Sequence, residues 1–100
     1  MNLKEYQRLA RRSMNGGLSI NGQILMCLVG LLGELGEVSE PLKKHIFRGQ
    51  QYSLDSITLE LGDVLWYLTM LADTLGIDMS DVAEYNVTKL AIRHGLDDEE

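Results

Sequence analysis

Two short acidic segments stand out in this chain because each places two carboxylates three residues apart. The first is Glu34-Leu35-Gly36-Glu37-Val38, and the second is Glu60-Leu61-Gly62-Asp63-Val64. On a helix, this spacing brings two side chains onto one face. The midpoint between the segments falls at Arg48–Gly49, in the most turn-like stretch of the chain, so a helical hairpin would bring the two pairs together. Four converging carboxylates repel one another unless a cation lies among them.

Acidic pairs of this spacing are more often part of a solvated helix surface than of a metal site. Two features of these segments favour the metal site. Both segments lie in the most apolar parts of their sequences, and neither pair has a basic residue four positions further along that could form an ion pair within a helix. The residues at those positions are Val38, Pro41, Val64 and Tyr67. Buried unpaired carboxylates are costly, so we expect a bound cation. Its ligands would be Glu34, Glu37, Glu60 and Asp63.

The sequence also limits which metal could bind. A di-iron site of the ferritin type needs Glu-x-x-His pairs. The residues three positions before His45 and His94 are Leu42 and Ala91, so that pattern is absent. All-oxygen ligation instead suits Mg²⁺, with Mn²⁺ possible, and argues against zinc, copper or thiolate chemistry.

Composition narrows the class of protein. The 100 residues make one domain, and 45% of them are apolar, as in ordinary soluble proteins. The net charge of −6 includes four acids at 97–100, and the absence of a basic stripe argues against a partner that is a nucleic-acid polymer. Cys27 is the single cysteine, which excludes an internal disulfide and suits a reducing compartment. Because the run Ile24–Val29 is too short to span a bilayer, we expect a cytoplasmic protein without membrane contact.

Apolar residues recur with helical spacing along most of the chain, and no segment alternates with a period of two. The pattern predicts four helices at about 3–14, 22–47, 54–75 and 81–93, with N-caps at Asn2, Asn21, Ser53 and Ser80. Short connections between them predict an all-α fold, an antiparallel four-helix bundle that occupies residues 1–94. Residues 95–100 are expected to form a frayed acidic tail.

Three irregularities qualify this pattern. Pro41 should kink the second helix or break it, because proline cannot donate the helical hydrogen bond. The third helix is apolar on several sides, which predicts burial against a partner subunit and hence a homo-oligomer. Glycines interrupt the helices at Gly30, Gly33, Gly36 and Gly62. Close helix packing and room for a ligand's phosphates would each explain them, and both explanations stay open.

A second polar group lies near the end of the chain. Asn86, Lys89 and Arg93 are spaced so that they share one face of the fourth helix. A solvated surface is the simpler interpretation, and contact with phosphate oxygens beside the metal is the functional one. Lys43 and Lys44, which follow the first acidic segment, allow the same two interpretations. The candidate phosphate-binding residues are therefore Lys44, Asn86, Lys89 and Arg93.

Four blocks of these residues occur in a specific order. They are Gly33-Glu34-Leu35-Gly36-Glu37-Val38, Lys43-Lys44, Glu60-Leu61-Gly62-Asp63-Val64-Leu65-Trp66-Tyr67-Leu68 and Asn86-x-x-Lys89-Leu90-x-x-Arg93. In this order they resemble the MazG-like all-α nucleoside triphosphate pyrophosphohydrolases, over about residues 3–94. Two features depart from that family's pattern. One is Pro41, and the other is the short acidic end after Arg93, where relatives often continue with a Pro-Glu-Gly-Phe-like segment.

The resemblance implies a helical bundle that works as a dimer or tetramer. It implies hydrolysis of a nucleoside triphosphate between the α and β phosphates, which gives a monophosphate and pyrophosphate. Carried over residue by residue, the four acids would hold Mg²⁺. Asn86, Lys89 and Arg93 would contact the phosphate chain.

The acidic cluster also predicts how the reaction would proceed. One carboxylate would orient or deprotonate the attacking water, and of the four we choose Glu37. Loss of turnover in a Glu34→Gln variant would identify an enzyme. Two other interpretations stay open: a metal-dependent module that binds a nucleotide without turnover, and an oligomeric helical bundle without a ligand. The base and sugar that the site prefers cannot be read from the sequence.

Overall fold

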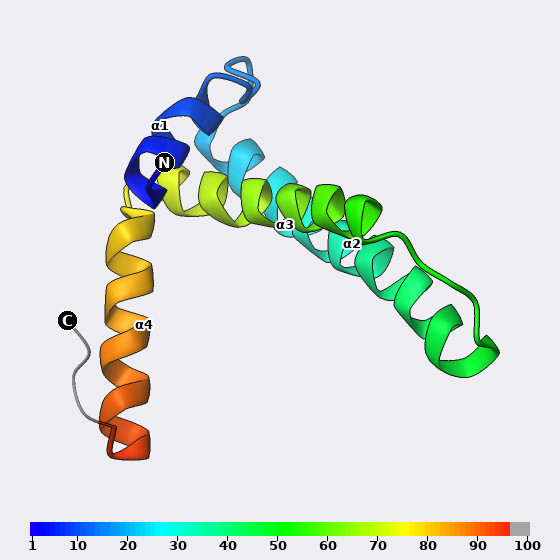
Figure 1. The fold of residues 1–100 in the computed structure, drawn as a ribbon. Coiled ribbons are helices and arrows are strands. Elements are labelled where there is room, and N and C mark those ends of the chain that lie inside the picture. Colours follow the sequence, from blue (N-terminus) through cyan, green and yellow to red (C-terminus); the bar gives the residue numbers. More distant parts are fainter. Residues whose placement is uncertain (97–100) are drawn as a thin grey trace.

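The computed structural model describes residues 1–96 and has an all-α fold (Figure 1). Its helices are α1 (Leu3–Arg11), α2 (Ile20–Arg48), α3 (Leu54–Thr74) and α4 (Met79–His94). No strand occurs among residues 1–96. The all-α class and the four predicted helices are therefore confirmed. Gly95 ends α4 as a left-handed cap with a φ of 64°. The prediction of a frayed tail falls mainly on residues 97–100, which lie outside the described residues.

Two helices begin at the residues that the sequence predicted. Asn2 Oδ1 accepts a hydrogen bond of 2.8 Å from the backbone N–H of Glu5 at the start of α1. Ser53 Oγ accepts one of 3.2 Å from the N–H of Ser56 at the start of α3. Each side chain satisfies one of the backbone donors that a helix leaves free at its first turn.

The caps of α2 and α4 were predicted two residues too late. Ser19, not Asn21, caps α2, and its hydroxyl accepts a hydrogen bond of 3.0 Å from the N–H of Gly22. Asp78, not Ser80, caps α4, and its carboxylate accepts from the N–H of Ser80 at 2.8 Å. At both places two capping residues stand two positions apart, and the helix begins at the earlier one because this adds helical backbone hydrogen bonds.

α2 continues without a break through Pro41. The alternative that the helix ends there is therefore wrong, and the 29 residues of α2 form one rod. Proline removes one backbone hydrogen bond, but the other turns of α2 hold the helix together. The acidic segment before Pro41 and the two lysines after it consequently belong to a single element.

α2 and α3 form the antiparallel hairpin that the sequence predicted (Figure 1). The turn begins at Gly49, which has a φ of 67° and caps α2. α1 packs across α3 and the start of α4, and α4 then leads away from the hairpin. Within the described part of one chain, α4 has no contact with α2. A single chain therefore does not form the predicted antiparallel four-helix bundle.

A buried amide fixes the direction in which α4 leaves. Gln7 on α1 donates hydrogen bonds of 2.9 Å to Asp73 Oδ1 and to the carbonyl of Ile77, and its Oε1 accepts one of 2.8 Å from the N–H of Met79. Arg11 on α1 adds an ion pair to Asp73. Because these contacts lie on both sides of the turn between α3 and α4, α1 holds the two helices at a set angle.

The core of one chain is small and lies where α1 meets the hairpin. Its buried members are Ala10, Cys27 and Met70, and the partly buried residues around them are Tyr6, Met14, Met26, Trp66 and Leu71. Cys27 and Met70 are fully buried. Cys27 therefore packs as an apolar residue and is a free thiol.

A single chain leaves much apolar surface uncovered. Its Cα radius of gyration is 16.3 Å, whereas a compact domain of this length has about 13 Å. Its accessible surface is 7570 Å², whereas a globular monomer of this mass exposes about 5,700 Å². Large apolar residues that are more than 60% exposed include Leu25, Val29, Leu32, Phe47, Leu59, Tyr85, Val87 and Ile92. Surfaces of this kind mark places where another molecule binds.

By length and composition alone, α2 could cross a membrane. Its most apolar 18-residue window has a mean hydropathy of 1.3, and 6% of that window is buried. The short apolar run Ile24–Val29 is therefore not sufficient to exclude a membrane-spanning α2. The absence of membrane contact stays a prediction. A helix buried between subunits passes the same test. Glu34 and Glu37 stand in the middle of α2, where a carboxylate would be costly at the centre of a bilayer.

Candidate metal and nucleotide site

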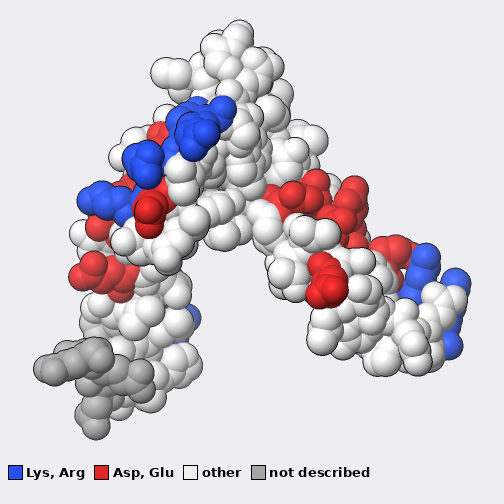
Figure 2. Space-filling model, turned by 45° about the horizontal axis from the view of Figure 1, so that its top comes forward, with Lys and Arg blue, Asp and Glu red and all other residues white. Residues whose placement is uncertain are grey.

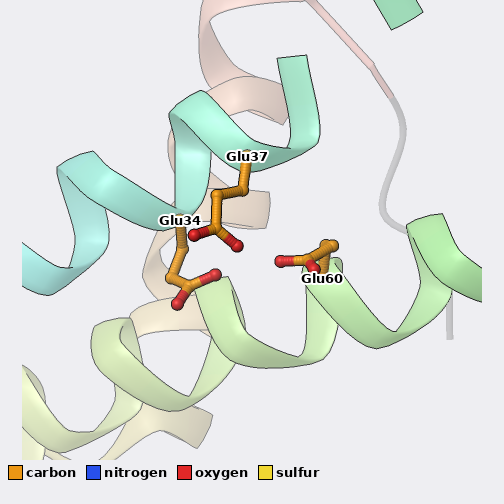
Figure 3. A group of neighbouring side chains, drawn as sticks. All are labelled: Glu34, Glu37 and Glu60. Carbon is orange, nitrogen blue, oxygen red and sulfur yellow. The ribbon is translucent and has the colours of Figure 1, made fainter. Parts of the chain in front are cut away.

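Three of the four predicted metal ligands meet between α2 and α3. Glu34 and Glu37 project from α2 towards Glu60 on α3 (Figure 3). One carboxylate oxygen from each lies within 4.8 Å of the others. The spacing of three residues puts the two α2 acids on one face, and the hairpin turn at Gly49 brings α3 against that face. Such a group of oxygens is the donor set that a hard divalent cation prefers.

Asp63 lies next to this group but is not one of the three. It lines a pocket of about 350 Å³ together with residues from α2, α3 and the end of α1. The lining residues are Ser13, Glu34, Asp63, Trp66 and Tyr67. Glu34 belongs both to the acidic group and to the pocket wall, so the two are continuous. Metal binding by Asp63 stays a prediction.

Two carboxylate oxygens in this group are buried without a hydrogen-bond partner. They are Glu34 Oε2 and Glu60 Oε2. A buried carboxylate oxygen without a partner is expensive. A cation between α2 and α3 would satisfy both atoms at once, so the residues present fit a divalent metal ion.

Glu37 is exposed, and its ionisation is linked to the carboxylates of α3. A hydrogen bond with Glu60 is the main cause that raises the pKa of Glu37, and the negative charge of Glu60, partial burial and the charge of Asp63 add to it. The neighbouring carboxylates therefore favour the protonated form of Glu37 in the metal-free protein.

Basic side chains lie away from the acidic group. The ion pairs among residues 1–96 are Lys4–Asp78, Arg11–Asp73, Lys43–Glu40 and Lys44–Glu40. None of them includes Glu34, Glu37, Glu60 or Asp63. Figure 2 shows acidic side chains along the α2–α3 arm, with basic ones at its far tip and over α1. The carboxylates therefore have no protein cation that neutralises them within the described chain.

One chain does not bring the predicted phosphate-binding residues to the acids. Lys44 is partly exposed and pairs with Glu40 at 3.8 Å. Asn86, Lys89 and Arg93 are exposed on α4, which points away from the hairpin (Figure 1). A role for these α4 residues at the acidic site would need α4 from another copy. Their binding of phosphate stays a prediction.

Sequence reasoning missed one part of the site, the contact between Ser13 and Trp66. The indole N–H of Trp66 donates a hydrogen bond of 2.9 Å to Ser13 Oγ, and both residues line the pocket. A lone serine at the end of a helix carries no signal that could have revealed this contact, because its partner lies on α3, far along the chain.

Comparison with known proteins identifies the family. The model of the MazG nucleotide pyrophosphohydrolase domain matches residues 23–95. The chain belongs to the MazG family. This confirms the resemblance drawn from the sequence blocks. The description of this family names a nucleotide pyrophosphohydrolase domain.

The MazG match covers nearly all of α2 and the whole of α3 and α4, so both acidic segments lie within it. The chain is also similar to the Gene 37 protein of Mycobacterium phage L5, with 40% identity over 70 residues. That alignment covers 65% of this chain and 60% of the phage protein, so the chain spans about three fifths of its relative's length. No solved structure matches the chain at a significant level.

Proposed function

We propose that this MazG protein hydrolyses a nucleoside triphosphate to the monophosphate and pyrophosphate, with Mg²⁺ as its cofactor and Mn²⁺ as a possible substitute. The main support is the convergence of Glu34, Glu37 and Glu60. Among residues 1–96, two of their buried oxygens have no partner, and no basic side chain forms an ion pair with them. Family membership supports the class of reaction.

Each acid has a distinct part in this proposal. Glu34 and Glu60 would hold the metal through their unpartnered oxygens, with Glu37 and Asp63 as the third and fourth ligands. Glu37 would take the proton from the attacking water. It is exposed and can therefore reach solvent, where a carboxylate can accept a proton from water. When bound, Mg²⁺ would supply positive charge that polarises the phosphate and acidifies water.

The phosphate chain would need cations from elsewhere in the assembly. Lys89 and Arg93 would neutralise the negative charge that builds up on the departing pyrophosphate. Asn86 and Lys44 would donate hydrogen bonds to phosphate oxygens. Because α4 leaves the hairpin of its own chain, we propose that the three α4 residues act on the acids of a second copy.

We therefore propose a homo-oligomer, a dimer or a tetramer, in which helices of different copies complete the antiparallel bundle. The exposed surface supports this. One chain exposes about 1,900 Å² more than a globular monomer of its mass, and a standard interface covers about 800 Å² on each partner. The excess suits an obligate oligomer. We place it in the cytoplasm without a membrane or nucleic-acid partner, since burial between copies accounts for the apolar character of α2.

The test is a panel of ribo- and deoxyribonucleoside triphosphates incubated with the purified oligomer and Mg²⁺, in which pyrophosphate release is measured. We expect release from at least one of them and none in EDTA. Glu34→Gln should abolish turnover. Glu40→Gln is the matched control, because Glu40 lies on the same helix but pairs with lysines, and it should keep turnover. A folded wild-type protein that releases no pyrophosphate from any triphosphate would contradict the proposal. Metal-dependent nucleotide binding in that protein would then support a binding module.

A further inference from the structure

The ring of Tyr67 on α3 occupies the space in which α2 would carry a side chain. A Cβ atom at Gly30 would lie 2.5 Å from Tyr67 Cζ and 2.6 Å from Cδ1, with Cε1 closer still. These separations are far inside van der Waals contact. Gly33 and Gly36 lie further along the same helix, and a Cβ at either would meet no other part of the described chain within 4 Å, apart from its chain neighbours and the nearby backbone of α2 itself. Gly30 alone of these three therefore has a packing reason within one chain.

Trp66 also packs against the ring of Tyr67. The two rings meet edge to face, with centroids 5.1 Å apart and an interplanar angle of 88°. The indole of Trp66 is itself fixed by its hydrogen bond of 2.9 Å to Ser13. Tyr67 is half-buried between these contacts. Its orientation is thus set from two directions, by the absence of a side chain at Gly30 and by the indole.

This ring forms part of the wall of the pocket beside the acids. Tyr67 lines that pocket together with Glu34 and Asp63. A triphosphate held at the acids would extend its remaining part, the sugar and base, into the adjoining space. The orientation of Tyr67 then decides how much room that part has.

We propose that Gly30 is a positioning residue for the substrate. By seating the ring of Tyr67 against α2, it sets the shape of the pocket beside the acids and thereby determines which nucleotides bind. This inference rests on the proposed function. An alanine at position 30 would push the ring out of its seat, towards Trp66 or into the pocket.

Steady-state kinetics on the oligomer with Mg²⁺ test the effect on substrate. For the best triphosphate of the panel, Gly30→Ala should raise KM by about fivefold or more and change kcat by less than about twofold. Its order of preference among the triphosphates should also change. Gly16→Ala is the control, because Gly16 lies in the loop between α1 and α2 and an added Cβ there meets nothing within 4 Å; it should leave both constants unchanged. On a Tyr67→Ala background, Gly30→Ala should change KM by less than about twofold, because no ring is left to displace.

The fluorescence of Trp66 tests the packing of Tyr67 against Gly30 directly, and it does not depend on turnover. The chain has a single tryptophan, so its emission reports on the surroundings of this one indole, which include the ring of Tyr67. Gly30→Ala should shift that emission, and Gly16→Ala should not. On the Tyr67→Ala background, Gly30→Ala should have no further effect. Unchanged Trp66 emission in Gly30→Ala would contradict the claim that the ring of Tyr67 packs against Gly30.

The two arms separate this inference from the proposed function. Equal KM values for Gly30→Ala and Gly16→Ala would overturn the role in substrate selection and leave the proposed enzyme activity intact. A wild-type protein without turnover would contradict the proposed function. In that case the dissociation constant of a non-hydrolysable triphosphate, measured by quenching of Trp66 fluorescence, replaces KM. Gly30→Ala should raise this constant by about fivefold or more, and the control variant should leave it unchanged. Equal affinities in the two variants would overturn the inference there as well.

Discussion

Glu60→Gln should stabilise the metal-free protein, although the substitution falls within a proposed active site. Glu34 and Glu60 have carboxylate oxygens within 4.8 Å of each other. Two unit charges at that distance repel by about 0.9 kcal/mol in water and by about 3.5 kcal/mol at an effective dielectric constant of 20. Because both side chains are partly buried, we expect Glu60→Gln to raise the free energy of unfolding in EDTA by about 1–3 kcal/mol. An amide at position 60 also donates hydrogen bonds that a carboxylate cannot.

Thermal unfolding at one fixed protein concentration measures this effect, because each kcal/mol shifts the melting temperature of such a domain by about 4–8 °C. In EDTA, Glu60→Gln should melt above the wild type. In Mg²⁺ the wild type should gain more than the variant, since the variant has lost a ligand. Glu40→Gln is the control, and it should melt within a few degrees of the wild type in both buffers because exposed ion pairs contribute little. A Glu60→Gln protein that melts below the wild type in EDTA would refute the reasoning.

Three further predictions follow from the structure. Gln7→Ala leaves the buried N–H of Met79 without an acceptor, so it should lower the free energy of unfolding by about 1–3 kcal/mol in denaturant titrations; an unchanged midpoint would show that the amide does not hold α4. Leu32→Glu and Leu59→Glu place a charge at positions that are 72% and 73% exposed in one chain, and each should reduce the mass measured by light scattering; an unchanged assembly with both variants would contradict burial of these faces between copies. The raised pKa of Glu37 favours folding of the metal-free protein below the ordinary carboxyl pKa, and this contribution is lost as pH rises through the raised value. Mg²⁺ needs the ionised form, so the gain in melting temperature from Mg²⁺ should grow with pH across that window; a gain that is independent of pH would contradict the link.

The site could be predicted from the sequence as far as it depends on local spacing. Glu34 and Glu37 share a face because helical geometry requires it, and a turn at Gly49 can be recognised from composition. Whether Glu60 or Asp63 lies closest to α2 depends on the rotation of α3 about its axis. That rotation is set by packing, such as the seat of Tyr67 against Gly30, which no short motif encodes.

The path of α4 could not be predicted, because long-range contacts decide it. The hydrogen bonds from Gln7 to Asp73 and Ile77 join opposite ends of the chain, and a glutamine in a polar helix gives no sign of them. Short connections predicted a bundle. A short loop keeps the ends of two consecutive helices close together, but it does not fix the angle between the helices. Apolar residues on several sides of α3 did predict that a single chain would leave apolar surface exposed.

A crystal structure of the oligomer grown with Mg²⁺ and a non-hydrolysable triphosphate analogue would test the central claim most directly. The account predicts an ion at about 2.0–2.1 Å from carboxylate oxygens of Glu34 and Glu60, with the phosphates of the analogue bound to the same ion. Carboxylates that turn away from each other into solvent, with the analogue bound elsewhere or absent, would contradict it.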